Sequence, residues 1–267
     1  MWIDSHCHLD AGEFDADREQ VVERARVAGV RMMLIPAVQA SGFGRTAACA
    51  HRFGFAYALG IHPLYVREAR DGDLERLAEA VQIARSDPNF VGIGEIGLDF
   101  FEPVHDAVRQ ESFYQAQLRL AREHSLPVVV HVRRSADRLL KYLRRIEVPG
   151  GVAHAFNGSE YQAREFIACG LRLGFGGSAT FNGSMRIRRH AASLPESAIV
   201  LETDAPDIAP HWLHDVDAIA RNEPAQLPRI SAEIAQLRAI SPHELARVNR
   251  RNLLETFPRL ARLAPEP

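Results

Sequence analysis

The feature that most constrains the fold is a regular alternation of short apolar runs with longer amphipathic segments. Several runs, such as VVV at 128–130 and MMLI at 32–35, are almost continuously apolar. Strands of a parallel sheet have this composition because helices bury them on both faces. The alternation therefore predicts βα units around a parallel sheet. The predicted strands are residues 2–5, 32–37, 55–61, 90–96, 127–132, 151–155, 171–176 and 198–202.

The segments between these runs carry apolar residues at helical spacing. After Ser135, which we expect to cap a helix, Leu139 and Leu143 fall on one face. Residues 226–257 indicate two helices that are broken near Ser241. Eight strands, seven intervening helices and a helical tail predict one (β/α)8 TIM barrel that spans residues 1–267 as a single domain. An open, doubly wound sheet is the alternative.

Composition excludes some classes of protein. Thirty-two Lys and Arg against 34 Asp and Glu give a net charge of −2. This excludes binding to nucleic acid by bulk charge, but it leaves binding through a local patch or a metal. No apolar run is long enough for a membrane helix, and the first residues do not resemble a signal peptide. The three cysteines, Cys7, Cys49 and Cys169, are too few for a disulfide framework, so we expect reduced thiols in a cytoplasmic protein.

Residues that commonly bind metals follow five of the predicted strands. In a closed barrel the carboxyl ends of the strands form one face, where catalytic groups of this fold gather. Each residue has an ordinary alternative: a lone histidine can be a satisfied polar residue, and Glu95 could pair with an arginine. The residues at these ends are His6 and His8, Glu95, His131, His154 and Asp204.

Burying several such groups together favours a bound cation. Isolated ionised groups cost several kcal/mol to desolvate, and a cation offsets this cost for all of them. Histidine with carboxylate suits Zn²⁺, Mn²⁺ or Mg²⁺. Six ligands are too many for one tetrahedral ion, so we expect two ions that share a carboxylate. Cys7 lies between His6 and His8 and should point the opposite way.

Six motifs in fixed order give the chain a family resemblance. They are IDSHCHLD at 3–10, GIHP at 60–63, GEIGLD at 94–99, LPVVVHVRR at 126–134, HAFNGS at 154–159 and LETDAPD at 201–207. With these motifs the chain resembles the TatD-related metal-dependent hydrolases from residue 3 to about 257. This resemblance implies an amidohydrolase-like barrel and an activity like that of the metal-dependent deoxyribonucleases in the family.

The resemblance also implies roles for individual residues. His6, His8 and Asp204 would hold a first ion, while His131 and His154 would hold a second that Glu95 bridges to the first. His62 would line the substrate site, and Asp99 is a family acid. The chain departs from the family pattern at Leu64, where some members have His, and at Phe100, where many have Tyr.

The residues also suggest how a substrate would be bound and cleaved. Water activated by the ions would be the nucleophile, and Asp204 its proton acceptor, unless Asp204 only caps a helix. Arg133 should point to the same side as His131, two residues earlier. Arg221 and Asn222 follow the eighth strand near the barrel mouth, where arginine can bind phosphate. The glycines of LGFGG at 173–177 do not form a dinucleotide fingerprint, so we expect them to allow close packing of the seventh strand.

Three functions remain open from the sequence. The first is an exonuclease-like phosphodiesterase that acts on DNA ends or single strands. The second is a related hydrolase of an ester or amide, such as an aminoacyl-tRNA deacylase or a lactonase. The third is a barrel used only for binding. Glu95 stands where many binuclear amidohydrolases have a bridging lysine, which favours the TatD-like class without fixing the substrate. We expect no membrane association, and a monomer is favoured.

Overall fold

The chain forms a parallel barrel in which each strand pairs with the next. A computed structural model describes all residues except 71, 215–220 and 265–267. The strand order is β1 to β8 without interruption. The backbone N–H of Ser5 donates to the carbonyl of Leu201 (3.0 Å), which joins the end of β8 to the exit of β1. The strands are β1 (Trp2–Asp4), β2 (Val30–Pro36), β3 (Ala56–Leu59), β4 (Phe90–Asp99), β5 (Val128–Arg133), β6 (Gly151–Ala153), β7 (Leu171–Phe175) and β8 (Ile199–Leu201).

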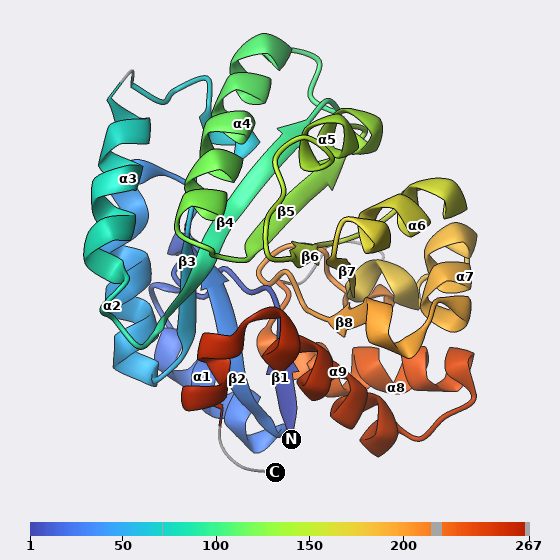
Figure 1. Ribbon diagram of the computed structural model, residues 1–267. Helices are drawn as coiled ribbons and strands as arrows, with labels where there is room; N and C mark the ends of the chain where they lie inside the picture. Colours follow the sequence, from blue (N-terminus) through green and yellow to red (C-terminus); the bar gives the residue numbers. More distant parts are fainter. Residues whose placement is uncertain (71, 215–220, 265–267) are drawn as a thin grey trace.

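Helices alternate with the strands and cover the outside of the barrel (Figure 1). The predicted (β/α)8 architecture is therefore confirmed. The predicted break near Ser241 is confirmed too, because its side chain accepts a hydrogen bond from the backbone N–H of Glu244 and begins α9. The helices of the described residues are α1 (Arg18–Val27), α2 (Phe43–Phe53), α3 (Asp73–Ala84), α4 (Ala107–Glu123), α5 (Ala136–Leu143), α6 (Glu160–Ala168), α7 (Met185–Ser193), α8 (Leu227–Arg238) and α9 (Pro242–Thr256). None of these helices has both the length and the apolar character needed to cross a bilayer.

The core lies inside the barrel and between the barrel and its helices. Val128, Val129 and Val130 of β5 are fully buried, as their continuous apolar run predicts. Leu77 and Val81 of α3 are also fully buried and form the helix face that packs inward. Burial on both faces makes the strands rigid supports for the side chains at their carboxyl ends.

Several strand limits differ by one or two residues from the prediction, for example β3, which ends at Leu59 rather than at residue 61. Two other local predictions are also wrong. Strand β4 ends at Asp99 rather than at residue 96, because Gly97 does not interrupt it. A Cβ atom at Gly97 would lie 2.3 Å from the carbonyl oxygen of His131, so only glycine allows β4 and β5 to approach this closely. Ser135 precedes α5, but its side chain makes no capping hydrogen bond. Its hydroxyl instead donates to the carbonyl of Leu98 (2.6 Å), which ties α5 to β4.

Candidate metal centre

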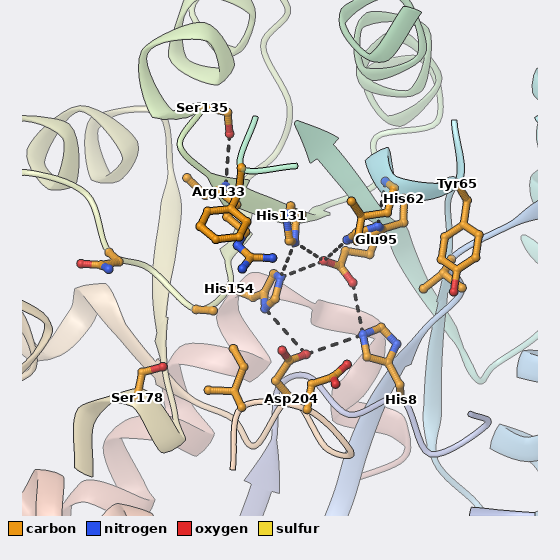
Figure 2. Close-up of a pocket in the computed structure, with 18 of the residues that line it drawn as sticks. His8, His62, Tyr65, Glu95, His131, Arg133, Ser135, His154, Ser178 and Asp204 are labelled. Carbon is orange, nitrogen blue, oxygen red and sulfur yellow. Dashed lines mark hydrogen bonds and ion pairs between the residues drawn. The ribbon is translucent and has the colours of Figure 1, made fainter. Parts of the chain in front are cut away.

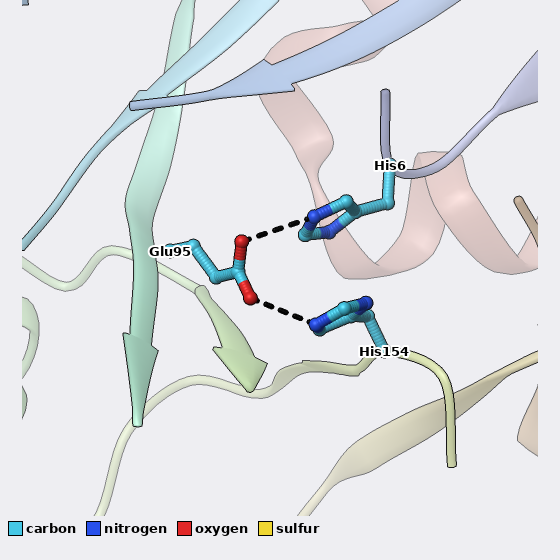
Figure 3. Close-up of side chains that lie close together, drawn as sticks. All are labelled: His6, Glu95 and His154. Atoms are coloured by element: carbon cyan, nitrogen blue, oxygen red, sulfur yellow. Dashed lines mark ion pairs between the residues drawn. The ribbon is translucent and has the colours of Figure 1, made fainter. Parts of the chain in front are cut away.

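Six candidate ligands converge at the carboxyl-terminal mouth of the barrel. Figure 2 shows the side chains of His8, Glu95, His131, His154 and Asp204 pointing toward one another. His6 lies behind them against Glu95 (Figure 3). Their donor atoms form overlapping groups in which all atoms lie within 4.8 Å of one another. Residues up to 198 positions apart in the sequence thus form one cluster.

Glu95 occupies the middle of this cluster, and one of its oxygens faces the histidines that follow β1. The Oε2 atom lies 3.1 Å from His6 Nε2 and 3.3 Å from His8 Nε2. The two Nε2 atoms are 3.1 Å apart. His6 and His8 are two residues apart in extended chain, so both rings project to the same side. Cys7 between them is fully buried on the other side, as predicted, and its thiol donates to the carbonyl of Ala205.

The other oxygen of Glu95 faces the histidines from β5 and β6. The Oε1 atom lies 3.0 Å from His131 Nδ1 and 2.8 Å from His154 Nε2. These two nitrogens are 3.2 Å apart. Figure 3 shows the consequence for one pair of ligands: His6 and His154 approach different oxygens of the same carboxylate. Glu95 thus faces histidine nitrogens with both of its oxygens, and the two groups meet at His6 and His154, whose ligand atoms lie within 4.8 Å of each other.

Asp204 adds a carboxylate to the His6 and His8 side. Its Oδ1 atom lies 3.3 Å from His6 Nε2 and 3.6 Å from His8 Nε2. The residue has a φ of 57°, a left-handed conformation that aspartate tolerates better than most residues. Its backbone N–H donates to the carbonyl of His6 (2.9 Å). The buried carboxylate of Asp4 supports this junction by accepting from the Thr203 hydroxyl (2.6 Å).

Two further carboxylates hold ligand histidines from behind. Asp99 Oδ2 lies 2.9 Å from His131 Nε2 and so keeps His131 Nδ1 directed at Glu95. Glu202 Oε1 accepts from the backbone N–H of Ala155 (2.5 Å) and lies 3.8 Å from His154 Nδ1. Gly174 makes room for this carboxylate, since a Cβ atom there would lie 2.2 Å from Glu202 Oε2.

His62 differs from the other histidines in how its ring is oriented. Its Nδ1 atom accepts the backbone N–H of Leu64 (3.2 Å). A neutral ring that accepts at Nδ1 carries its proton on Nε2, and His62 Nε2 lies 3.2 Å from Glu95 Oε1. His62 therefore presents an N–H group rather than a lone pair, which suits a hydrogen-bond donor and not a metal ligand.

Burial perturbs the pKa values of the acids in the cluster. It raises the pKa of Asp204 to about 6, that of Asp4 to about 7 and that of Glu202 to about 8. Burial also lowers the pKa of His6 well below its usual range, and the neighbouring His154 adds to this shift. Burial opposes the charged forms of His8 and His154 too, but Glu95 and Asp204 outweigh it and raise the pKa of His8 to about 9 and that of His154 to about 10. Negative and positive charge are thus coupled within the cluster.

The donor set fits divalent cations. Glu95 Oε2 and Asp204 Oδ1 are buried acceptors that have no hydrogen-bond donor among the described residues. Nitrogens and carboxylate oxygens that converge within about 3 Å satisfy one another poorly, because several of these atoms must share each histidine proton. A divalent cation accepts lone pairs from all of them, at bond lengths of about 2.0–2.2 Å for zinc. The residues present thus match the chemistry of an ion on each side of Glu95.

A large cavity opens above the cluster. Its volume is about 1590 Å³, larger than the pocket of a typical small ligand, and the lining includes Arg133 and Arg134 on one wall and Asp207 on another. As predicted, Arg133 reaches the cavity on the same side as His131. Figure 2 shows its side chain beside His131 at the edge of the cluster.

Two other residues that the sequence suggested for substrate lie outside this cavity wall. Asn222 is fully buried, and its amide group donates to the carbonyls of Thr203 (2.8 Å) and Asp207 (2.8 Å). The guanidinium of Arg221 donates to Asp17 (2.8 Å) and to Glu223 (2.9 Å). Both side chains are therefore engaged in holding the loop after β8.

Sequence reasoning missed Glu202, Phe101 and Arg134. Glu202 could have been found from LGFGG, because a glycine-rich strand beside a strand that ends in ETD indicates space for a buried carboxylate. Phe101 and Arg134 line the cavity. Their only sequence signal is their nearness to Asp99 and Arg133, which is too weak to identify them.

Comparisons with known proteins agree with this geometry. The TatD related DNase family matches residues 3–258. The uncharacterized metal-dependent hydrolase YjjV of Escherichia coli K12 is 36% identical over 96% of this chain and 97% of its own length. The crystal structure of YjjV superposes with a TM-score of 0.90, covering 96% of this chain and 98% of that one. The 3′-5′ ssDNA/RNA exonuclease TatD of a Rahnella species is 35% identical over 96% of this chain and 97% of its own.

Proposed function

This chain belongs to the TatD related DNase family, and from that premise we propose that it hydrolyses phosphodiester bonds at the ends of single-stranded DNA. It is a metal-dependent hydrolase, and YjjV carries the same description in its name. The observation that carries the proposal is the position of Glu95 between two groups of histidine nitrogens. Sites with two ions are suited to phosphodiesters, since both the attacking and the leaving oxygen need compensation of charge.

The residues divide into two candidate ligand sets. His6, His8 and Asp204 would hold one ion, His131 and His154 would hold the other, and Glu95 would bind both, as the distances between their atoms suggest. Divalent cations such as Mg²⁺, Mn²⁺ or Zn²⁺ would lower the pKa of a water molecule and compensate the charge that develops on phosphoryl oxygens. Both ligand sets lie on the cavity floor, so a scissile phosphate must enter from the arginine-lined mouth.

Asp204 is the residue that would take the proton from the attacking water. Its Oδ1 atom is buried and has no hydrogen-bond donor among the described residues, so it is free to accept one. Its backbone is fixed by the hydrogen bond to His6, which keeps the carboxylate at the cavity floor. Glu95 contributes by holding the two ligand sets together, and His62 holds Glu95 with its Nε2–H group.

Arg133 is the residue that we propose to contact a backbone phosphate of the bound strand directly. Its side chain is half exposed in the cavity, and its Nη1 atom lies 3.9 Å from Asp99 Oδ2. A guanidinium group presents several N–H donors in a plane, which matches two phosphate oxygens. For Asn222 the hydrogen bonds described above favour a supporting role in the loop over a substrate contact.

The test is metal-dependent degradation of labelled single-stranded DNA. The protein is treated with EDTA, then supplied with Mg²⁺, Mn²⁺ or Zn²⁺ and incubated with oligonucleotides labelled at either end. We expect progressive shortening from one end that requires metal. If no phosphodiester is cleaved with any ion while an ester or amide is, the second hydrolase function replaces this proposal. The cytoplasmic location and the monomeric state expected from the sequence stay predictions.

A further inference from the structure

An exposed aromatic residue at the cavity mouth holds two arginines. Phe101 follows the end of β4, lines the cavity and is 41% exposed, which is unusual for a large apolar side chain. The Cζ atom of Arg133 lies 3.8 Å from the centre of the Phe101 ring, and that of Arg134 lies 4.5 Å from it. Both guanidinium groups are therefore within the range of cation–π contacts with one ring.

The local chain is built to bring both arginines to this ring. Consecutive residues of a strand point to opposite sides, so two neighbouring arginines would normally diverge. Arg134 has a φ of 56°, which turns the chain immediately after β5. The hydroxyl of Ser135 accepts from the backbone N–H of Arg133 (3.2 Å) and so stabilises this turn. The turn lets Arg133 and Arg134 face the same ring.

The aromatic partner leaves the guanidinium N–H groups available. A guanidinium that stacks on a ring uses its flat face, whereas its N–H donors lie at its edge. Among the described residues, Arg134 has no acidic partner, and the contact of Arg133 with Asp99 is long at 3.9 Å. Arg221 is the opposite case, because Asp17 and Glu223 neutralise it. Phe101 thus positions two guanidinium groups and leaves their N–H donors available to a ligand.

The position of this group is coupled to the candidate metal centre. Asp99 Oδ1 accepts from the backbone N–H of Phe101 (2.9 Å), while Asp99 Oδ2 holds His131 (2.9 Å). The backbone N–H of Phe100 also donates to the carbonyl of Arg133 (2.9 Å). One buried carboxylate therefore fixes both the aromatic residue and a candidate ligand of the second ion.

We propose that Phe101, Arg133 and Arg134 form a subsite for the phosphate next to the scissile one in a single-stranded nucleic acid. This proposal rests on the proposed phosphodiesterase function. The part of the cavity lining that follows β1 and β8 contains Asp10, Glu13 and Asp207, which repel phosphates. Arg45 also lines the cavity there, but its guanidinium is paired with Asp15 (2.5 Å). The bound strand therefore leaves the centre over the arginine-bearing wall. A substrate with one phosphodiester and no neighbouring phosphate does not use the subsite.

The experiment compares two substrates and one binding probe. Cleavage rates are measured for an oligothymidylate and for the p-nitrophenyl ester of thymidine 5′-phosphate, which has a single phosphodiester. Binding is measured by the fluorescence anisotropy of a phosphorothioate-linked oligothymidylate, which resists hydrolysis. The variants are Arg134→Ala, Arg134→Lys and Phe101→Leu. Arg189→Ala is the matched control, since Arg189 is exposed on α7 and lies outside the cavity wall.

The subsite predicts a selective effect on the polymer. Arg134→Ala raises the KM for the oligonucleotide about tenfold and leaves its kcat unchanged. Phe101→Leu raises the KM about threefold to fivefold, because the arginines lose their support. The KM of Arg134→Lys for the oligonucleotide lies between that of Arg134→Ala and that of the wild type. The slope of log affinity against log salt concentration becomes shallower by about 0.7 for each phosphate that a variant no longer binds. The kinetic constants of these variants for the nucleotide ester do not change. Arg189→Ala changes the constants for neither substrate.

Other results overturn the subsite. Equal effects on the oligonucleotide and the nucleotide ester mean that these residues only support the fold of the centre, and no effect on either means that the polymer does not pass over them. If the wild type cleaves neither substrate but binds the probe through Arg134, the proposed function fails and the subsite stands. If Arg134→Ala binds the probe as tightly as the wild type, the subsite fails whatever the activity.

Discussion

The floor and the rim of the barrel mouth are built in different ways. On the floor, His6, Glu95 and His154 are buried, and they project from strands or from the residues that directly follow them. On the rim, Phe101 and Arg134 are exposed and lie just beyond the ends of β4 and β5. The floor is held by the sheet, since its residues lie in the strands or within a few residues of their ends, whereas the rim depends on a stacked ring and a turn. The candidate metal ligands, which need fixed distances, are thus separate from the rim residues, which can adjust to a flexible nucleic-acid strand.

The strongest way to sharpen this comparison is to remove the carboxylate between the two ligand sets. Glu95→Gln removes the charge that both ions share, so we expect kcat/KM to fall about 10³-fold on the oligonucleotide and on the nucleotide ester alike. Metal analysis should show fewer than two ions per chain. Anisotropy of the phosphorothioate probe should change less than tenfold, since the rim remains. A variant that retains two ions and most of its activity would show that Glu95 does not link them.

Asp99 allows the floor and the rim to be separated at one residue. In Asp99→Asn the amide oxygen can still accept from the Phe101 N–H, but the amide NH₂ group cannot accept from His131. We expect about 10- to 100-fold weaker binding of one ion in calorimetric titrations, with probe binding unchanged. Asp99→Ala should lower both the metal affinity and the affinity for the probe. If Asp99→Asn lowers the affinity for the probe and leaves metal affinity unchanged, Asp99 does not orient His131 as proposed.

Substitution of Glu202 tests whether the carboxyl group beside His154 affects metal binding without affecting nucleic-acid binding. Glu202→Gln replaces the carboxyl group 3.8 Å from His154 Nδ1 with an amide, and we expect metal affinity to fall about tenfold without a change in probe binding. Gly174→Ala should act in the same direction, because its Cβ would displace the Glu202 carboxylate.

The control for the glycine is Gly183→Ala, where a Cβ atom meets nothing within 4 Å. Metal titrations and thermal unfolding are compared for the three variants. Unchanged metal affinity in both Glu202→Gln and Gly174→Ala would show that Glu202 does not support metal binding by His154.

The smallest effect on activity is expected at Asn222. Asn222→Ala leaves the carbonyls of Thr203 and Asp207 without their amide donor, so the free energy of unfolding should fall by about 1–3 kcal/mol. Urea denaturation measures this change, and KM for the oligonucleotide should stay within about twofold of the wild type. An increase of KM with unchanged stability would instead favour the substrate contact that the sequence suggested.

The sequence predicted the floor better than the rim for a physical reason. Strand-end residues such as His131 and His154 are recognisable because a short apolar run fixes where each strand ends and the barrel brings all ends to one face. The predicted limit of β4 is three residues short, because the sequence does not show that Gly97 allows a close contact with β5.

The rim and the loop after β8 depend on partners that local patterns cannot identify. Arg221 and Asn222 lie in the predicted loop, but the pairing of Arg221 with Asp17 spans 204 positions. Arg134 gives the same local signal as any arginine, and only its contact with Phe101 distinguishes it. Whether an arginine is neutralised or available is thus decided by tertiary structure.

The central claim is that divalent ions bind on both sides of Glu95, and anomalous diffraction from crystals soaked in Mn²⁺ tests it most directly. The account predicts two peaks per chain, one contacting His6, His8 and Asp204 and the other contacting His131 and His154, with Glu95 between them. A single peak, or peaks that leave Glu95 without an ion on one side, would contradict it.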